Sequence, residues 1–347
     1  MRRRVITAAL LCAACGTDAP VETGTGTEPG LVFRLANELT PDSKIGDVSF
    51  LFKERLEQAS PDGSIRAGEI EVVLYDQGMV GTERQLLENA YFGVMEVVQI
   101  NSSVVSTIDH AFNLFDLPYI FVSQAHHREI LQGEVGQVFL DRLQDFRLRG
   151  LGFYGLGFRA LFYKAPADGC IERPEDLRGL KLRVIESPIM INSINAMGAS
   201  ATPVPFSEQF QALKTGVIDG ADNAARVFIS HRFYETGTNC FTQTEHFTNQ
   251  HVLVANNDWF QSLEPKYQRR ILDVSRQIIP EFRAVWDAAT QEALDQMEGV
   301  GVTVNAIENK QPFMDRTENV STQFLRDYPS VPRELYDRIR AASGEVQ

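Results

Sequence analysis

Residues 173–188 read RPEDLRGLKLRVIESP, and this stretch sets the fold class. The proline and acidic residues at its start predict a turn over 174–177, and the apolar residues that follow predict a short strand over 180–184. A helix is expected next, over 187–197, with Gly198 placed to end it. A strand that leads into a helix is the building unit of α/β proteins.

The same alternation extends to both sides of this stretch. Strands are expected over 150–154 and 160–163, and a short helix over 207–215. Thr82 is suited to cap a helix. The N-terminal part reads strand, helix, strand, helix, strand over 31–36, 45–59, 69–75, 82–93 and 94–100. This order predicts a parallel or mixed sheet with helices on both faces.

A helix much longer than the average of about 11–12 residues is expected from Pro265 onward. Pro280 inside this helix removes a backbone donor and should kink it, so we expect a bent strut that reaches across two lobes. The apolar residues that fit one face are Tyr267, Ile271, Val274, Ile278, Phe282, Val285, Ala289 and Met297.

Composition excludes several classes of protein. The 347 residues carry 33 Lys and Arg against 46 Asp and Glu, a net charge of −13, whereas nucleic-acid binders and polybasic membrane-surface proteins need a positive field. With 44% hydrophobic and 23% charged residues the chain is globular, and its length suggests two lobes. No metal site is expected, because the adjacent His126 and His127 cannot share a helical face and the other histidines lack companions at metal spacing.

The N-terminus has the layout of an export signal. Three arginines precede a short apolar run at residues 5–14, which is too short to span a bilayer. Small residues before Cys15 resemble a bacterial lipobox, although Cys12 stands where that pattern usually has an aliphatic residue. We therefore expect a lipoprotein signal peptide over 1–14 and lipidation of Cys15, with a plain signal peptide as the alternative.

Residues 15–30 are rich in Thr, Gly and Pro and predict a flexible tether. Export would leave Cys170 and Cys240 in an oxidising compartment, where such a pair is expected to form a disulfide. Two separated buried thiols are the alternative, because pairing needs closely spaced Cα atoms.

Several motifs agree, in order, with one known family. From about residue 31 to about residue 304 the chain resembles the solute-binding proteins of tripartite ATP-independent periplasmic (TRAP) transporters, the DctP-type family. The motifs are GTERQLLENAYFG at 81–93, GLGFRALFYKAP at 155–166, RPEDLRGLKLRVIESP at 173–188, MGASATPVPFSEQFQALKTGVIDGADN at 197–223 and HRFYETGTNCFTQTEH at 231–246.

The resemblance implies a set of ligand contacts. Arg183 matches the family's selectivity arginine, whose guanidinium offers a carboxylate two parallel donors, a geometry that lysine lacks. Asp222 departs from the Glu that is common in the family. The other implied contacts are Arg159, Asn223 and the wall aromatic Phe206, with Asn101, Asn37 and Glu83 from the first lobe.

The resemblance also implies the architecture and the function. We expect a two-lobed periplasmic binding protein fold, with lobe I over 31–156 and 250–288 and lobe II over 157–249 and 289–347. The protein would act as a monomer without a cofactor, capture a small organic acid in the cleft and deliver it to the membrane subunits of a TRAP permease. Its only link to the membrane would be the lipid anchor.

Alternatives remain for both function and ligand. The same cleft could belong to a periplasmic enzyme with Glu83 or His246 as acid or base, or to a ligand-sensing partner of a signalling receptor. The run from Ser187 to His246 looks most like members that bind sugar acids such as uronates. C4-dicarboxylates, keto acids and aromatic acids stay open.

Overall fold

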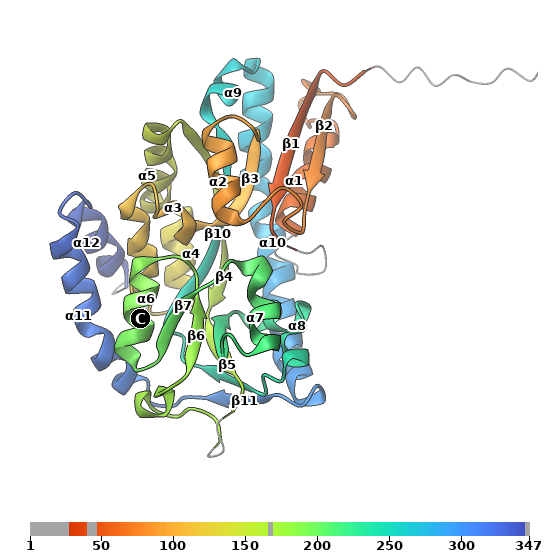
Figure 1. Cartoon of the computed structure of the whole chain (residues 1–347). Helices are drawn as coiled ribbons and strands as arrows, with labels where there is room; N and C mark the ends of the chain where they lie inside the picture. The colour runs from red at the N-terminus through yellow and green to blue at the C-terminus, as the bar shows by residue number, and fades with distance from the viewer. Residues whose placement is uncertain (1–27, 40–46, 166–168, 344–347) are drawn as a thin grey trace, which may run out of the picture.

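The computed structural model describes residues 28–39, 47–165 and 169–343 (Figure 1). The predicted signal peptide, Cys15 and most of the predicted tether lie outside the described residues. Two sheets organise the fold, and helices cover them on both sides. We call the part built on the five-stranded sheet the first lobe and the part built on the six-stranded sheet the second lobe. The predicted α/β, two-lobed fold class is confirmed.

The five-stranded sheet is mixed. Its strand order is β2-β1-β3-β10-β4, with β1 parallel to β2 and β3, and β10 antiparallel to β3 and β4. The parallel part is the strand–helix–strand–helix–strand segment predicted for the N-terminal region. The strands are β1 Leu31–Asn37, β2 Ile70–Tyr75, β3 Val97–Asn101, β4 Leu148–Phe158 and β10 Thr248–Asn256.

The six-stranded sheet contains the motif at 173–188. Its order is β11-β9-β5-β8-β6-β7, and β6 runs parallel to both β7 and β8 while β5 is antiparallel to β8 and β9. The predicted turn, strand and helix are η4 Pro174–Leu177, β6 Lys181–Val184 and α6 Pro188–Met197. The strands are β5 Ala160–Tyr163, β6 Lys181–Val184, β7 Ser200–Pro203, β8 Gly220–Asn223, β9 Cys240–Gln243 and β11 Thr303–Ala306.

Helices occupy most of the remaining chain. Thr82 caps α2 as predicted, because its side chain accepts a hydrogen bond from the backbone of Gln85. The α-helices are α1 Asp47–Glu57, α2 Glu83–Tyr91, α3 Ser102–Val105, α4 Gln124–Gln132, α5 Glu134–Arg142, α6 Pro188–Met197, α7 Gln209–Thr215, α8 Ala225–Ser230, α9 Asn257–Ser262, α10 Pro265–Gly299, α11 Gln311–Asp327 and α12 Arg333–Ala342. The 3-10 helices are η2 His110–Asp116, η3 Leu143–Phe146, η4 Pro174–Leu177, η5 Phe206–Glu208 and η6 Phe233–Thr236. Among the described residues, no helix has both the length and the apolar character needed to cross a membrane.

The predicted long helix is α10, which has 35 residues and contains Pro280. It packs against α1 and β4 of the first lobe and against α8 and β11 of the second, so it joins the two lobes. One expected core position is wrong: Val285 is exposed, and the next residue, Trp286, is buried and donates from Nε1 to the carbonyl of Leu156 at 3.0 Å. The buried face of α10 therefore continues from Phe282 to Trp286, four residues further on.

The chain passes between the sheets at two further places. One crossing leads from β4 to β5 through Arg159, and the other leads from β9 to β10 through residues 244–247. Both lie close to the expected lobe boundaries at 156/157 and 249/250. That the predicted segments move as two rigid lobes stays a prediction.

Cys170 and Cys240 form a disulfide, with their Cα atoms 5.8 Å apart. Cys240 begins β9, which lies between β11 and β5 in the second sheet, and the bridge closes a loop with a sequence separation of 70 residues. A crosslink across a loop of this length stabilises a fold mainly by reducing the conformational entropy of the unfolded chain.

The double variant Cys170→Ser and Cys240→Ser should therefore lose stability. The chain-entropy relation gives about 4 kcal/mol for a loop of this size, to be measured as the shift in chemical denaturation of a form that lacks residues 1–27. The denatured, unreduced wild-type form should show no free thiol. Two free thiols would contradict the bond.

Candidate functional site

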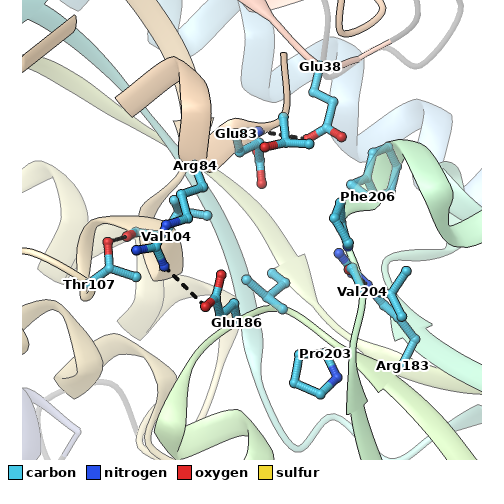
Figure 2. Close-up of a pocket in the computed structure, with 13 residues that line it drawn as sticks. Glu38, Glu83, Arg84, Val104, Thr107, Arg183, Glu186, Pro203, Val204 and Phe206 are labelled. Carbon is cyan, nitrogen blue, oxygen red and sulfur yellow. Dashed lines mark hydrogen bonds and ion pairs between the residues drawn. The ribbon is translucent and has the colours of Figure 1, made fainter. Parts of the chain in front are cut away.

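A cavity of about 340 Å³ lies between the lobes (Figure 2). The first lobe supplies the residues at the start of α2 together with Glu38, Val104 and Thr107, and the second lobe supplies residues 203–206 and the end of β6. A small inner recess of about 20 Å³ shares residues of both lobes with this cavity. The recess is lined by Leu39, Glu83, Asn101, Arg159, Arg183, Ile185, Phe206, Asn223, Val227, Asn249 and His251.

Arg183 stands on β6, between β7 and β8, and only 2% of it is exposed. Its Nε donates to the carbonyl of Val204 at 2.8 Å, and its guanidinium lies 5.9 Å from the centre of the Phe206 ring. In the described part of the chain, no carboxylate forms an ion pair with this side chain. Burial and the nearby Arg159 lower the pKa of Arg183 to about 10, so it keeps its positive charge at neutral pH.

Arg159 lies at the crossing from β4 to β5 and is 1% exposed. It holds the Asp222 carboxylate through Nε at 2.5 Å and Nη2 at 3.1 Å, and Nη2 also donates to the Asp222 carbonyl at 2.7 Å. Burial alone would raise the pKa of Asp222, but the Arg159 charge keeps it below the usual range. Asp222 therefore neutralises Arg159 and leaves Arg183 as the unbalanced positive charge.

Three buried asparagine side chains form a ladder between the sheets. Asn101 Nδ2 donates to Asn249 Oδ1 at 2.7 Å, and Asn249 Nδ2 donates to Asn223 Oδ1 at 2.8 Å. Asn223 Oδ1 accepts a second bond from the backbone of Ala224. Because its oxygen is occupied in this way, Asn223 offers its Nδ2 donor to the recess.

Two acidic side chains line the cavity from the first lobe. Glu83 Oε1 accepts from the backbone N–H of Asn101 at 2.8 Å, and the backbone N–H of Glu83 donates to Glu38 Oε2 at 3.0 Å. The other Glu38 oxygen accepts from the backbone N–H of Ser207, in the second lobe, at 2.7 Å. Burial, followed by repulsion from Glu38, raises the pKa of Glu83 well above its usual range.

An ion pair spans the rim of the cavity, where Arg84 Nη1 of α2 lies 3.1 Å from Glu186 Oε1 of the second lobe (Figure 2). Both side chains are at least half exposed. With the contact between Glu38 and Ser207, this pair joins the two lobes across the cavity, so the structure has a closed cleft.

The structure brings six of the seven predicted ligand contacts to the recess: Arg183, Arg159, Asn223, Phe206, Asn101 and Glu83. Asn37 is placed elsewhere. Its Nδ2 donates to Ser49 Oγ at 3.2 Å and its Oδ1 accepts from the backbone of Leu39, so it supports the end of β1 and does not line the cavity.

The residues at the site that were not predicted from the sequence include Glu38, Asn249 and His251. Glu38 follows Asn37, the last residue of β1, and a shift of one residue at a strand end moves a side chain to the opposite face. Asn249 and His251 alternate along β10, so they face the same side.

The groups proposed for the enzyme alternative do not meet at the cavity. His246 lies behind Asp222, with its Nε2 3.6 Å from Asp222 Oδ2 and its Nδ1 bonded to Thr244, and it does not line the recess. Within residues 28–39, 47–165 and 169–343, no group of three or more His, Cys, Asp or Glu side chains could hold a metal ion.

Comparisons with known proteins identify the family of this chain. The model of the family described as bacterial extracellular solute-binding protein, family 7, matches residues 35–327. A solute-binding protein of Chromohalobacter salexigens is 31% identical over 271 residues, which cover 78% of this chain and 79% of that protein.

Two solved structures extend the comparison to bound ligands. A TRAP periplasmic solute-binding protein of Chromohalobacter salexigens with bound D-glucuronate has a TM-score of 0.82 and 28% identity, and covers 89% of this chain and 99% of its own. A second, from Xanthobacter autotrophicus with bound β-D-galacturonate, has a TM-score of 0.81, 28% identity and the same coverage. The resemblance expected from the sequence motifs is confirmed.

The Arg159–Asp222 pair yields a prediction about stability. Asp222→Asn keeps the shape of the side chain but leaves the Arg159 charge buried without a counter-ion, which should cost about 3–5 kcal/mol in unfolding free energy. The measurement is chemical denaturation of the ligand-free protein. Asp258→Asn, which breaks the exposed pair with Arg147, is the control and should change little. Equal effects of the two substitutions would contradict a structural role for the buried pair.

Proposed function

The chain belongs to family 7 of the bacterial extracellular solute-binding proteins, and on that premise we propose that it captures a uronate-type sugar acid by its carboxylate and delivers it to a TRAP-type permease. One observation carries the proposal. Arg183 is a buried positive charge without a carboxylate partner in the described chain, and it lines the recess beside the Asn223 donor.

A carboxylate is the group that fits this recess best. A buried charge is costly unless it is paired, and an arginine can hold both oxygens of a carboxylate in parallel hydrogen bonds. Asn223 Nδ2 can add a third donor. Arg159 is already paired with Asp222, so it needs no further counter-ion, but its charge still contributes to the positive potential of the recess.

The opposite wall favours a ligand with hydroxyl groups. Glu38 and Glu83 present carboxyl oxygens to the cavity, and such oxygens accept hydrogen bonds from sugar hydroxyls. A second carboxylate on the ligand would meet the Glu38 side chain and be repelled. The pairing of a cationic recess with an acidic wall therefore supports a sugar acid over a C4-dicarboxylate.

Cavity size and closure agree with a ligand of this kind. The volume of about 340 Å³ lies in the usual range for small-molecule sites. Closing the cleft over the ligand excludes water and strengthens the arginine–carboxylate contact. A ligand that binds both lobes stabilises the closed arrangement relative to the open one, and this coupling is what a carrier needs.

The relatives are transport proteins, and the proposed role requires binding without turnover. We propose that the protein acts as a monomer. The purified protein should bind D-glucuronate with one site per chain and return it unchanged. Ligand at 100 times its dissociation constant should stabilise the fold by about 2.7 kcal/mol, which a thermal-shift assay can detect. Conversion of D-glucuronate to a product would favour the enzyme alternative.

The arginine substitutions test the carboxylate contact. Arg183→Lys keeps the charge but loses the planar pair of donors, so affinity for D-glucuronate should fall at least about tenfold, and Arg183→Ala should lose more. Calorimetry measures the affinities, with melting temperature as a folding control. Arg173→Lys makes the same change at an exposed arginine outside the cavity and should leave binding unchanged. If the lysine variant at position 183 binds like wild type, the carboxylate is held elsewhere, and Arg159 becomes the leading candidate.

The named relatives of known structure are periplasmic, and we propose that this chain is held at a membrane through lipidated Cys15. In a bacterial host with lipoprotein processing, the full chain should fractionate with membranes. Cys15→Ser should be released as a soluble periplasmic protein. Equal solubility of the two forms would show that the lipobox interpretation is wrong.

A further inference from the structure

We propose that His251 and Glu83 together recognise one hydroxyl group of the ligand beside its carboxylate, and that His251 is thereby a specificity-determining residue. The inference rests on the proposed function, because it assigns a role to residues in the same recess. It concerns which acids are preferred, whereas the arginine contact concerns whether an acid binds at all.

His251 lies in β10 opposite Asn101 of β3, and only 4% of it is exposed. Its Nδ1 atom is buried and has no hydrogen-bond partner among the described residues. A buried polar atom without a hydrogen bond is costly, so the unpaired Nδ1 of His251 in a binding recess indicates that a ligand atom forms this hydrogen bond. The carboxyl oxygen Oε1 of Glu83 is 4.0 Å from this nitrogen.

The separation fits one intervening oxygen atom. A distance of 4.0 Å is too long for a direct hydrogen bond. An oxygen at about 2.8 Å from each atom would form hydrogen bonds to both, with an angle of about 90° between them. Glu83 Oε1 accepts only the backbone N–H of Asn101 among the described groups, so one of its lone pairs is available.

A hydroxyl has the chemistry that this pair requires. Burial, followed by the charge of Arg159, lowers the pKa of His251 to about 3, so its ring is neutral at physiological pH and has one donor and one acceptor nitrogen. A hydroxyl both donates and accepts, and it can therefore bridge the pair whichever partner carries the proton. A carbon-bound hydrogen cannot form these bonds.

The position of the pair selects the hydroxyl. His251 and Glu83 line the same small recess as Arg183, Arg159 and Asn223, so the bridged oxygen lies close to the ligand carboxylate. In a pyranose uronate the free hydroxyl nearest to the carboxyl group is the one on C4. We therefore assign the C4 hydroxyl to the His251–Glu83 pair.

The test is a binding cycle with D-glucuronate, 4-deoxy-D-glucuronate and 2-deoxy-D-glucuronate. Calorimetry on wild type and His251→Leu should show D-glucuronate and the 2-deoxy acid each weakened about tenfold by the substitution. The 4-deoxy acid should bind about tenfold more weakly than D-glucuronate to wild type and change little further in the variant. His251→Asn, which keeps a polar side chain, should recover part of the loss.

The possible outcomes distinguish a failure of the proposed function from a failure of the hydroxyl assignment. No binding of D-glucuronate to wild type would overturn the proposed function. Binding of D-glucuronate with an equal loss for all three acids in His251→Leu would overturn only the hydroxyl assignment. Wild type that binds the 4-deoxy acid as tightly as D-glucuronate would also overturn it, and this result does not depend on whether any variant folds. His126→Leu, which removes a buried histidine bonded to the carbonyl of Ile339, is the matched control and should leave the ratios unchanged.

Discussion

Arg183 is a positive charge enclosed in the protein, and the described chain provides no carboxylate to pair with it. The rest of the cleft is arranged around this constraint. Asp222 is committed to Arg159, and the acidic side chains of the opposite wall are turned toward backbone N–H groups. This charge favours an anionic ligand in the closed form, because a bound anion offsets the energetic cost of the buried guanidinium.

The asparagine ladder explains how the second lobe is positioned against the first. Asn249 belongs to β10 of the first sheet and holds Asn223, at the end of β8 in the second sheet, through a buried hydrogen bond. Each amide fixes the orientation of the next, so the donor that faces the recess is set by a partner on the other side of the interface. Recognition of the ligand thus depends on how the lobes meet.

The sequence was sufficient for the fold class, for most strands and helices and for the two arginines, because these depend on local periodicity and on spaced motifs. It was insufficient where a single residue of register decides which way a side chain faces. Asn37 ends β1 and Glu38 follows it, yet only Glu38 reaches the cavity. In α10 the buried face includes Trp286, while Val285 is exposed. The first half of β10 is polar, so the apolar periodicity that marks a buried strand is missing there although all of its residues are buried.

The ion pair at the rim has a consequence for how the carrier could report its state. An exposed pair such as Arg84 and Glu186 contributes between nothing and about 1 kcal/mol, which biases an equilibrium by no more than about fivefold. The hydrogen bond from Ser207 to Glu38 is a second contact across the cavity, so the pair at the rim biases the closed shape without fixing it. A bound ligand that contacts both lobes adds to this bias, and a membrane partner that recognises the closed shape would distinguish a loaded carrier from an empty one without touching the sugar.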